Sequence, residues 1–344
     1  MATKAAEIRH FLLRQIPTHP RDVTNLAVSE FGVSRQAINR HLRDLVADGL
    51  VKAQGRTKGR SYEVVTELER AVIPLDGQVN EDRLWREWAA PRLEGLPRNV
   101  RDICHHGFTE MVNNVVDHSE GTRVGISLSR SPALIDLRVD DDGVGIFRKI
   151  QTAFALEDEK HAVLELSKGK LTTDPSRHSG EGVFFTSRIF DQFSLLSGSL
   201  LLCHLPDDSD WLVEDKRPST GTIVKMVIDP ESTRTIKEVF DRFSDVEGDY
   251  SFDVTHVPVA LAQYGDENLV SRSQAKRLLV RLDRFGTVIL NFQGVRAVGQ
   301  AFADEVFRVF QLEHPEIKIG FVNASEPVRQ MIQRALSHDQ IPLL

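Results

Sequence analysis

Three polar side chains at four-residue spacing are the feature of this 344-residue sequence that most clearly could do chemistry. Glu110, Asn114 and His118 lie in RNVRDICHHGFTEMVNNVVDHS, whose apolar residues recur at helical spacing. On a helix, positions i, i+4 and i+8 line up on one stripe. A carboxylate and an amide one turn apart can orient a water molecule and hold a divalent cation beside phosphates. The residues expected on the buried face are Ile103, Gly107, Phe108, Met111, Val112 and Val115.

A second motif ends a pair of segments in which apolar and polar residues alternate as in paired strands. These segments are TRVGISLSR and ALIDLRVDDDGVGI. The second segment ends with Asp141, Gly143 and Gly145. This spacing puts a hydrogen-bond acceptor just before a backbone turn that can approach a flat ring closely.

Two further motifs complete the set. In HSGEGVFFTSRIFDQF, Gly180 and Gly182 open a helix, and the backbone N–H groups exposed at a helix N-terminus form a phosphate site. In STGTIVKMVI, Thr222 follows Gly221 and is expected in a strand.

The order of these four motifs resembles that of the GHKL ATP-binding domains of gyrase-type topoisomerases, MutL-type repair proteins, histidine kinases and anti-sigma-factor kinases. FTEMVNNVVDHS is similar to the N box, DDGVG to the first glycine box, SGEGVFFTS to the second, and STGT to the terminal threonine motif. The resemblance covers residues of about 95–230. It implies ATP and Mg²⁺ as cofactors.

The resemblance also implies a role for each matching residue. Asn114 would coordinate Mg²⁺, Asp141 would accept from the adenine amino group with support from Thr222, and the segment of about 150–179 would be an ATP lid. His118 is either a pocket residue or only the end of the polar stripe. The implied ATP-binding residues are Asn114, His118, Asp141, Gly143, Gly145, Arg177, Gly180, Gly182 and Thr222.

Glu110 matches the family residue that activates the attacking water or hydroxyl, and is therefore the candidate catalytic residue. The alternative is a carboxylate beside the metal without a catalytic role. The sequence departs from the family at Glu181, which puts a negative charge between the phosphate-loop glycines unless Arg177, His178 or Mg²⁺ offsets it.

Histidine-kinase chemistry is disfavoured, because a different domain stands where the histidine-containing dimerisation helices would be. His105 and His106 precede the polar stripe by one turn, and we expect them to be packed or solvated rather than phosphorylated.

The first 66 residues show the order helix, helix, turn, helix and basic hairpin. Ser34 is the expected N-cap of the third helix, Gly32 makes the turn, and Ile38, Leu42 and Leu45 form its buried stripe. This segment resembles the winged helix-turn-helix regulators over about 60 residues, which implies DNA binding. The alternative is a small helical domain with a solvated charged face. The candidate DNA-binding residues are Arg35, Gln36, Asn39, Arg40 and Arg43 on the third helix, and Arg56, Lys58 and Arg60 in the hairpin.

The last hundred residues alternate strands and helices, which indicates a small α/β layer domain. TVILNFQGV is typical of a strand buried on both faces, and Ser271 or Ser273 is expected to cap the helix in SRSQAKRLLVRLDRF. VILNFQGVRAVGQAFADEVF resembles STAS domains, the fold of anti-sigma-factor antagonists, whose loop carries a phosphorylated serine. Here Gly299, Gln300 and Ala301 occupy that loop without a hydroxyl, so we expect an interaction module rather than a phosphorylation switch.

Composition and charge restrict the remaining possibilities. Residues 1–66 hold eleven Lys and Arg against six Asp and Glu, a net +5, while the whole chain is −7, so one basic end stands on an acidic body. Two cysteines exclude a disulfide framework. The chain shows neither a 20-residue apolar run nor a signal-peptide pattern, so a cytoplasmic protein without a membrane segment is expected.

The sequence therefore predicts a multidomain α+β protein. The expected domains are a winged helix at 1–66, a connector at 67–98, a GHKL α/β sandwich at 99–232 with a mixed sheet and helices on one face, and a STAS-like domain at 245–344. The expected function is an ATP/Mg²⁺-binding, nucleotide-responsive DNA-binding regulator, with a possible protein partner at the STAS-like domain and a plausible homodimer. The alternatives are an anti-sigma-type serine/threonine protein kinase, a slow ATPase, and a scaffold in which ATP is structural.

Overall fold

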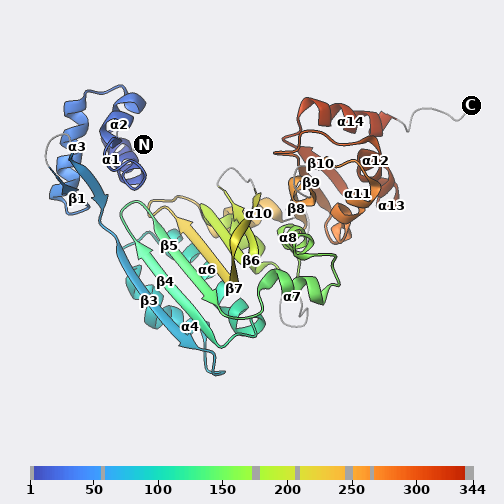
Figure 1. The fold of residues 1–344 in the computed structure, drawn as a ribbon, viewed down its shortest axis with the longest axis horizontal. Coiled ribbons are helices and arrows are strands. Elements are labelled where there is room, and N and C mark those ends of the chain that lie inside the picture. Colours follow the sequence, from blue (N-terminus) through green and yellow to red (C-terminus); the bar gives the residue numbers. More distant parts are fainter. Residues whose placement is uncertain are drawn as a thin grey trace, which may run out of the picture.

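A computed structural model describes residues 4–55, 59–172, 179–205, 210–244, 251–263 and 267–337 of the chain (Figure 1). The predicted site residues Arg56, Lys58 and Arg177 lie outside the described residues. The fold is a multidomain α+β arrangement with antiparallel and parallel sheets. None of the described helices is long and apolar enough to cross a membrane.

Three helices and a hairpin form the N-terminal domain, in the order that the sequence predicts. They are α1 (Lys4–Gln15), α2 (Val23–Phe31), α3 (Arg35–Ala47), β1 (Val51–Gln54) and β2 (Ser61–Val64), and the two strands pair antiparallel. The Ser34 hydroxyl accepts from the backbone N–H of Ala37 at 3.2 Å, which confirms the predicted cap. Gly32 ends α2 in the left-handed conformation.

The central sheet has five strands in the order β3-β4-β5-β7-β6. Every neighbouring pair is antiparallel, so the expected mixed sheet is wrong. The physical reason is the hairpin of β6 and β7, which places β7 between β5 and β6 and so removes the parallel pair that β5 and β6 would make. The strands are β3 (Glu67–Pro74), β4 (Arg123–Arg130), β5 (Ile135–Asp141), β6 (Gln192–His204) and β7 (Asp210–Ile228).

Part of the segment expected as a connector belongs to this sheet. Strand β3 pairs with β4 along its full length, from Glu67 opposite Arg130 to Pro74 opposite Arg123. Its first four residues are exposed and include all three of its charged side chains, so this half of the strand resembles a polar linker. Helix α4 (Glu81–Leu84), a π-helical turn at Trp85–Ala89 and α5 (Ala90–Arg92) follow, so the segment expected as a connector also contains helical turns.

Helices pack on one face of the sheet, as Figure 1 shows for α4 and α6 behind it. The helices of this part are α6 (Arg98–His118), α7 (Ile146–Ala153), α8 (Glu159–Lys168), α9 (Gly182–Ile189) and α10 (Ile236–Phe243). All six apolar residues predicted for the inner face of α6 are buried. On β5 the alternation that buries Ile135, Leu137 and Val139 also buries Asp141, so a carboxylate faces the helices.

The C-terminal domain is built on the parallel sheet β10-β9-β8, with the apolar strand β9 in the centre. Ser271 caps α11 in a reciprocal pair with Gln274, but the helix ends at Leu279, earlier than the sequence indicates, because Arg281 is left-handed. The elements are β8 (Val254–Pro258), α11 (Arg272–Leu279), β9 (Thr287–Asn291), α12 (Gln300–Asp304), a π-helical turn (Glu305–Val309), α13 (Phe310–Glu313), β10 (Lys318–Val322) and α14 (Glu326–Ser337).

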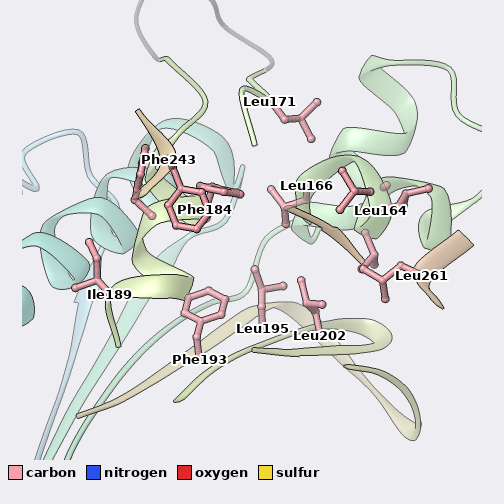
Figure 2. Close-up of a cluster of buried hydrophobic side chains, with 14 of the residues drawn as sticks. Leu164, Leu166, Leu171, Phe184, Ile189, Phe193, Leu195, Leu202, Phe243 and Leu261 are labelled. Carbon is pink, nitrogen blue, oxygen red and sulfur yellow. The ribbon is translucent and has the colours of Figure 1, made fainter. Parts of the chain in front are cut away.

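One hydrophobic core runs from the central sheet into the C-terminal domain. Figure 2 shows part of it, where Leu164 and Leu166 of α8 lie in the same buried cluster as Leu195 of β6 and Leu261 of the C-terminal domain. The N-terminal domain has a core of its own, joined by Ala133 from the turn between β4 and β5. Helix α8 therefore stands between the central sheet and the C-terminal domain.

Candidate functional site

A cavity of about 290 Å³ opens between α6, the end of β5, the middle of β7, the start of α7, and the segments around residues 171 and 180. The structure brings eight of the predicted site residues into its wall. They are Glu110, Asn114, His118, Asp141, Gly145, Gly180, Gly182 and Thr222. The stripe on α6 forms one side, as its four-residue spacing predicts.

Asp141 is held rigidly at one end of this cavity. Its Oδ1 accepts from the backbone N–H of Gly143 at 2.8 Å and of Thr222 at 3.2 Å, and the Thr222 side chain adds a hydrogen bond to the carboxyl. Burial raises the pKa of Asp141 above its ordinary value, and these hydrogen bonds lower it in part. A carboxylate has about four acceptor positions, so this one can still accept from a ligand's amino group.

Two glycines beside Asp141 are required by close approach of the backbone. A Cβ on Gly143 would lie 1.9 Å from the carbonyl oxygen of Ser119, and one on Gly221 would lie 2.2 Å from the carbonyl oxygen of Asp141. Gly143 therefore packs against the end of α6 instead of lining the cavity, which differs from the ATP-binding role that the resemblance implies for it.

The inner surface next to Asp141 is apolar, which suits a flat aromatic ring. Periodicity predicts that residues such as Met111, Val115 and Val224 are buried, but not that they share a cavity. Lys149 is a wall residue that sequence reasoning missed, since nothing distinguishes it from other surface lysines. Its Nζ donates to the carbonyl oxygen of His118 at 2.7 Å and contacts Glu120 at 3.0 Å.

The other end of the cavity holds the groups that could meet a metal ion. The Asn114 Nδ2 is buried and has no hydrogen-bond partner in the described part of the chain, which is costly unless a ligand supplies one. Rotation of the Asn114 side-chain amide by about 180° exchanges the positions of its nitrogen and oxygen, so Asn114 can present either an N–H donor or an oxygen ligand for a metal ion. No three His, Cys, Asp or Glu side chains cluster to hold a metal within the described ranges. A Mg²⁺ ion here would rely on Asn114, phosphate oxygens and water.

Glu110 lies against the second glycine motif. A Cβ on Gly182 would be 2.0 Å from Glu110 Oε2, so a larger residue at the start of α9 would displace this carboxylate. The chain also pairs across the cavity mouth, since the Leu171 N–H donates to the carbonyl oxygen of Gly180 at 3.1 Å. Glu110, Gly180 and Gly182 thus meet at one end of the cavity.

Glu181, the departure noted above, is half-buried at the same end. Burial raises the pKa of its carboxyl, while the charge of Lys170 and a hydrogen bond from Ser179 lower it. Lys170 was not among the residues expected to offset this charge. Arg177 and His178, which were, lie outside the described residues.

The predicted DNA-binding residues of α3 form an exposed face. Arg35, Gln36, Asn39, Arg40 and Arg43 are all exposed, and the opposite face of the helix is buried in the N-terminal core. Arg60 of the hairpin is also exposed and lies over the Tyr62 ring at 5.3 Å.

Both histidines before the stripe contact aromatic rings. The His105 ring stacks on Trp85 at 4.8 Å, and His106 is largely buried beside Phe240. Burial lowers the pKa of His106 to about 4, with a smaller contribution from the charge of His105. Both residues pack, as expected.

The loop before α12 is tightly packed. Gly299 caps this helix, and a Cβ there would lie 2.8 Å from the Val270 Cα. Gln300 and Ala301 follow in the first turn, so the position carries no hydroxyl.

Comparison with known proteins identifies one region. Residues 274–329 match the family described as a STAS-like domain of unknown function (DUF4325). This confirms the STAS-like character of the C-terminal domain over those residues. No curated protein is similar enough to this chain to count as a match.

Proposed function

We propose that this protein is an ATP- and Mg²⁺-binding regulator that binds DNA through its N-terminal domain and responds to nucleotide. In this proposal residues 1–66 are a winged helix-turn-helix domain and residues 99–232 a GHKL-type ATP-binding domain, to which β3 adds an edge strand. The observation that carries the proposal is the cavity itself. A rigid carboxylate, Asp141, stands beside an apolar surface at one end, Glu110 meets Gly182 at the other, and Asn114 and Gly180 line the same cavity.

The two ends suit the two ends of a nucleoside triphosphate. The adenine ring would lie on the apolar surface, with its amino group donating to Asp141, while Gly180 and Gly182 would surround the phosphates. Mg²⁺ would be held by Asn114 and would neutralise phosphate charge next to Glu181.

Contacts between the domains support a coupling of the two sites. His10 of α1 contacts Asp229, which directly follows β7, at 3.1 Å, and Ala133, which precedes β5, packs into the N-terminal core. The same two strands carry the cavity residues Asp141, at the end of β5, and Thr222, within β7. Coupling requires that nucleotide-bound and nucleotide-free states differ in DNA affinity, and these contacts are the route by which they would.

A second function is favoured by one observation, the position of the Glu110 carboxylate at the phosphate end. A base at this place could activate a water molecule, as in an ATPase, or a serine hydroxyl of a partner, as in an anti-sigma-type protein kinase. ATP labelled in the γ-phosphate separates these activities. Free labelled phosphate indicates an ATPase, labelled partner protein a kinase, and neither a binding protein.

The primary test is calorimetry of ATP–Mg²⁺ binding to the wild-type chain and to Asp141→Asn, with and without duplex DNA. Asparagine keeps one oxygen for the Gly143 and Thr222 N–H groups but turns the second acceptor into a donor, so we expect about 30-fold weaker binding. The matched control is Asp142→Asn, since Asp142 binds Thr122 and Arg123 outside the cavity. Unchanged affinity in Asp141→Asn would remove the adenine assignment.

DNA binding is tested separately. Replacing Arg40 and Arg43 by alanine should weaken binding and reduce the slope of log K against log salt by up to about 2. Persistent binding with the same slope would show that α3 is not the DNA-reading helix. An ATP affinity that DNA does not change would favour the kinase or ATPase.

A further inference from the structure

The loop Val280–Arg284 of the C-terminal domain is hydrogen-bonded to the chain segment Gly169–Thr172, which leads from α8 to the cavity. We name these the clamp loop and the wall segment. Lys168 Nζ donates to the Val280 carbonyl oxygen at 2.8 Å, and Lys170 Nζ donates to that of Arg284 at 2.7 Å. In return, the guanidinium groups of Arg281 and Arg284 donate to the Lys170 carbonyl oxygen at 3.0 and 3.2 Å.

The two sides of this contact have unusual backbone conformations. Lys170 has φ of 51° and Arg281 has φ of 62°, the left-handed region that side chains other than glycine seldom adopt. Such conformations persist only where surrounding contacts hold them. Here each residue hydrogen-bonds to its neighbours across the contact, so the wall segment and the clamp loop maintain each other's shape.

Buried charges and apolar packing fix the contact at its base. Lys168 and Glu165 are both about 1% exposed and lie 2.5 Å apart, and Arg281 Nε is 3.6 Å from Glu165. Figure 2 shows Leu164 and Leu166 of the same helix in the cluster that includes Leu261 of the C-terminal domain.

The wall segment is directly part of the nucleotide cavity. Leu171 and Thr172 line it, and the Leu171 N–H bonds to Gly180 at the phosphate end. Lys170 also offsets the charge of Glu181. A displacement of Lys170 would therefore move both the Leu171–Gly180 pairing and the positive charge at this end.

We propose that Arg281 and Arg284 are positioning residues for the cavity, so that docking of the STAS-like domain on its own chain sets the affinity for nucleotide. This inference rests on the proposed ATP site. It makes the C-terminal domain a regulator in cis, because any release of the clamp loop loosens the phosphate end.

The test compares the full chain with the variant Arg281→Gln/Arg284→Gln. The control is Arg272→Gln, a residue of the same domain whose guanidinium contacts Glu305 instead of the wall segment. Calorimetry with ATP–Mg²⁺ should show roughly fivefold weaker binding for the double variant, the size expected for losing about one net hydrogen bond, and no change for the control. Arg284→Lys should retain more affinity than Arg284→Gln, since the exposed lysine keeps the positive charge and most of the length of the arginine that donates to the Lys170 carbonyl oxygen.

Hydrogen exchange without nucleotide provides a second readout. In the double variant the Leu171 amide should exchange faster, while amides of the central strands β4 and β5 keep their wild-type rates. Equal affinity and equal exchange in wild type and double variant would overturn the inference, and so would uniformly faster exchange, which indicates a general loss of stability. If the wild-type chain binds no ATP, the proposed function fails, and the proposed effect on ATP affinity fails with it. The hydrogen-exchange result still decides whether the clamp loop positions the wall segment.

Discussion

Acidification should destabilise this protein in part through His106. Its side chain is largely buried on α6, and its Nε2 has no hydrogen-bond partner within the described residues. The pKa of the imidazole falls from 6.5 to about 4 in the folded chain, because burial disfavours the charged form. The unfolded chain therefore takes up the proton first as pH falls.

The magnitude follows from linkage. At 1.36 kcal/mol per pKa unit the full shift from 6.5 to about 4 corresponds to about 3.4 kcal/mol of unfolding free energy. The loss begins as pH falls through 6.5 and is complete below about 4. Between pH 7 and pH 4.5 the His106 contribution amounts to about 2.4 kcal/mol.

Urea denaturation of wild type and His106→Leu at pH 7 and pH 4.5 measures this contribution. Leucine removes the titrating group and leaves an apolar side chain of similar size beside Phe240. All other groups titrate in both proteins, so the wild type should lose about 2.4 kcal/mol more than the variant on acidification. Equal losses in the two proteins would refute the reasoning, as would an imidazole NMR titration that places His106 near pH 6.5.

Three further results are expected. Lys168→Met should lower the unfolding free energy by about 3 kcal/mol, because it leaves Glu165 buried without its closest cation. Adding Glu165→Leu should recover most of this loss. A double variant that is no more stable than Lys168→Met in urea denaturation would contradict this. Gly143→Ala should lower the unfolding free energy by about 1–3 kcal/mol and weaken ATP binding, since the new methyl group would meet a backbone oxygen at 1.9 Å. In the control Gly320→Ala a Cβ meets nothing within 4 Å, so its thermal unfolding should stay near that of the wild type. ATP affinity should fall as pH drops through the pKa of Asp141, which lies above 3.8, because the protonated carboxyl loses acceptor capacity; calorimetry showing constant affinity down to pH 3.8 would argue against its contact with adenine.

The part of the candidate site that could be predicted depends on spacing along single helices and strands. The four-residue spacing of Glu110, Asn114 and His118 needs only a helix to align them. The alternation along β5 that buries Val139 also buries Asp141, because side chains of a strand alternate between its faces. Such relations span a few residues and can be recognised in the sequence.

Contacts between distant parts of the chain could not be predicted in this way. The first half of strand β3 is mostly charged, as a linker can be, and only its pairing with β4 makes it part of the sheet. Lys149 and Lys170 resemble any surface lysine until folding sets one against the His118 carbonyl oxygen and the other against Arg284.

The sequence by itself determined the three helices of the N-terminal domain, α6, α9, the cap at Ser34, and eight of the residues that line the cavity. Each of these depends on periodicity or on hydrogen bonds between near neighbours. Only the tertiary structure decided the antiparallel order of the sheet and the grip of the clamp loop on the wall segment. The hydrogen bond from Arg281 to Lys170 joins residues 111 positions apart, and no local pattern specifies which distant carbonyl a given guanidinium will reach.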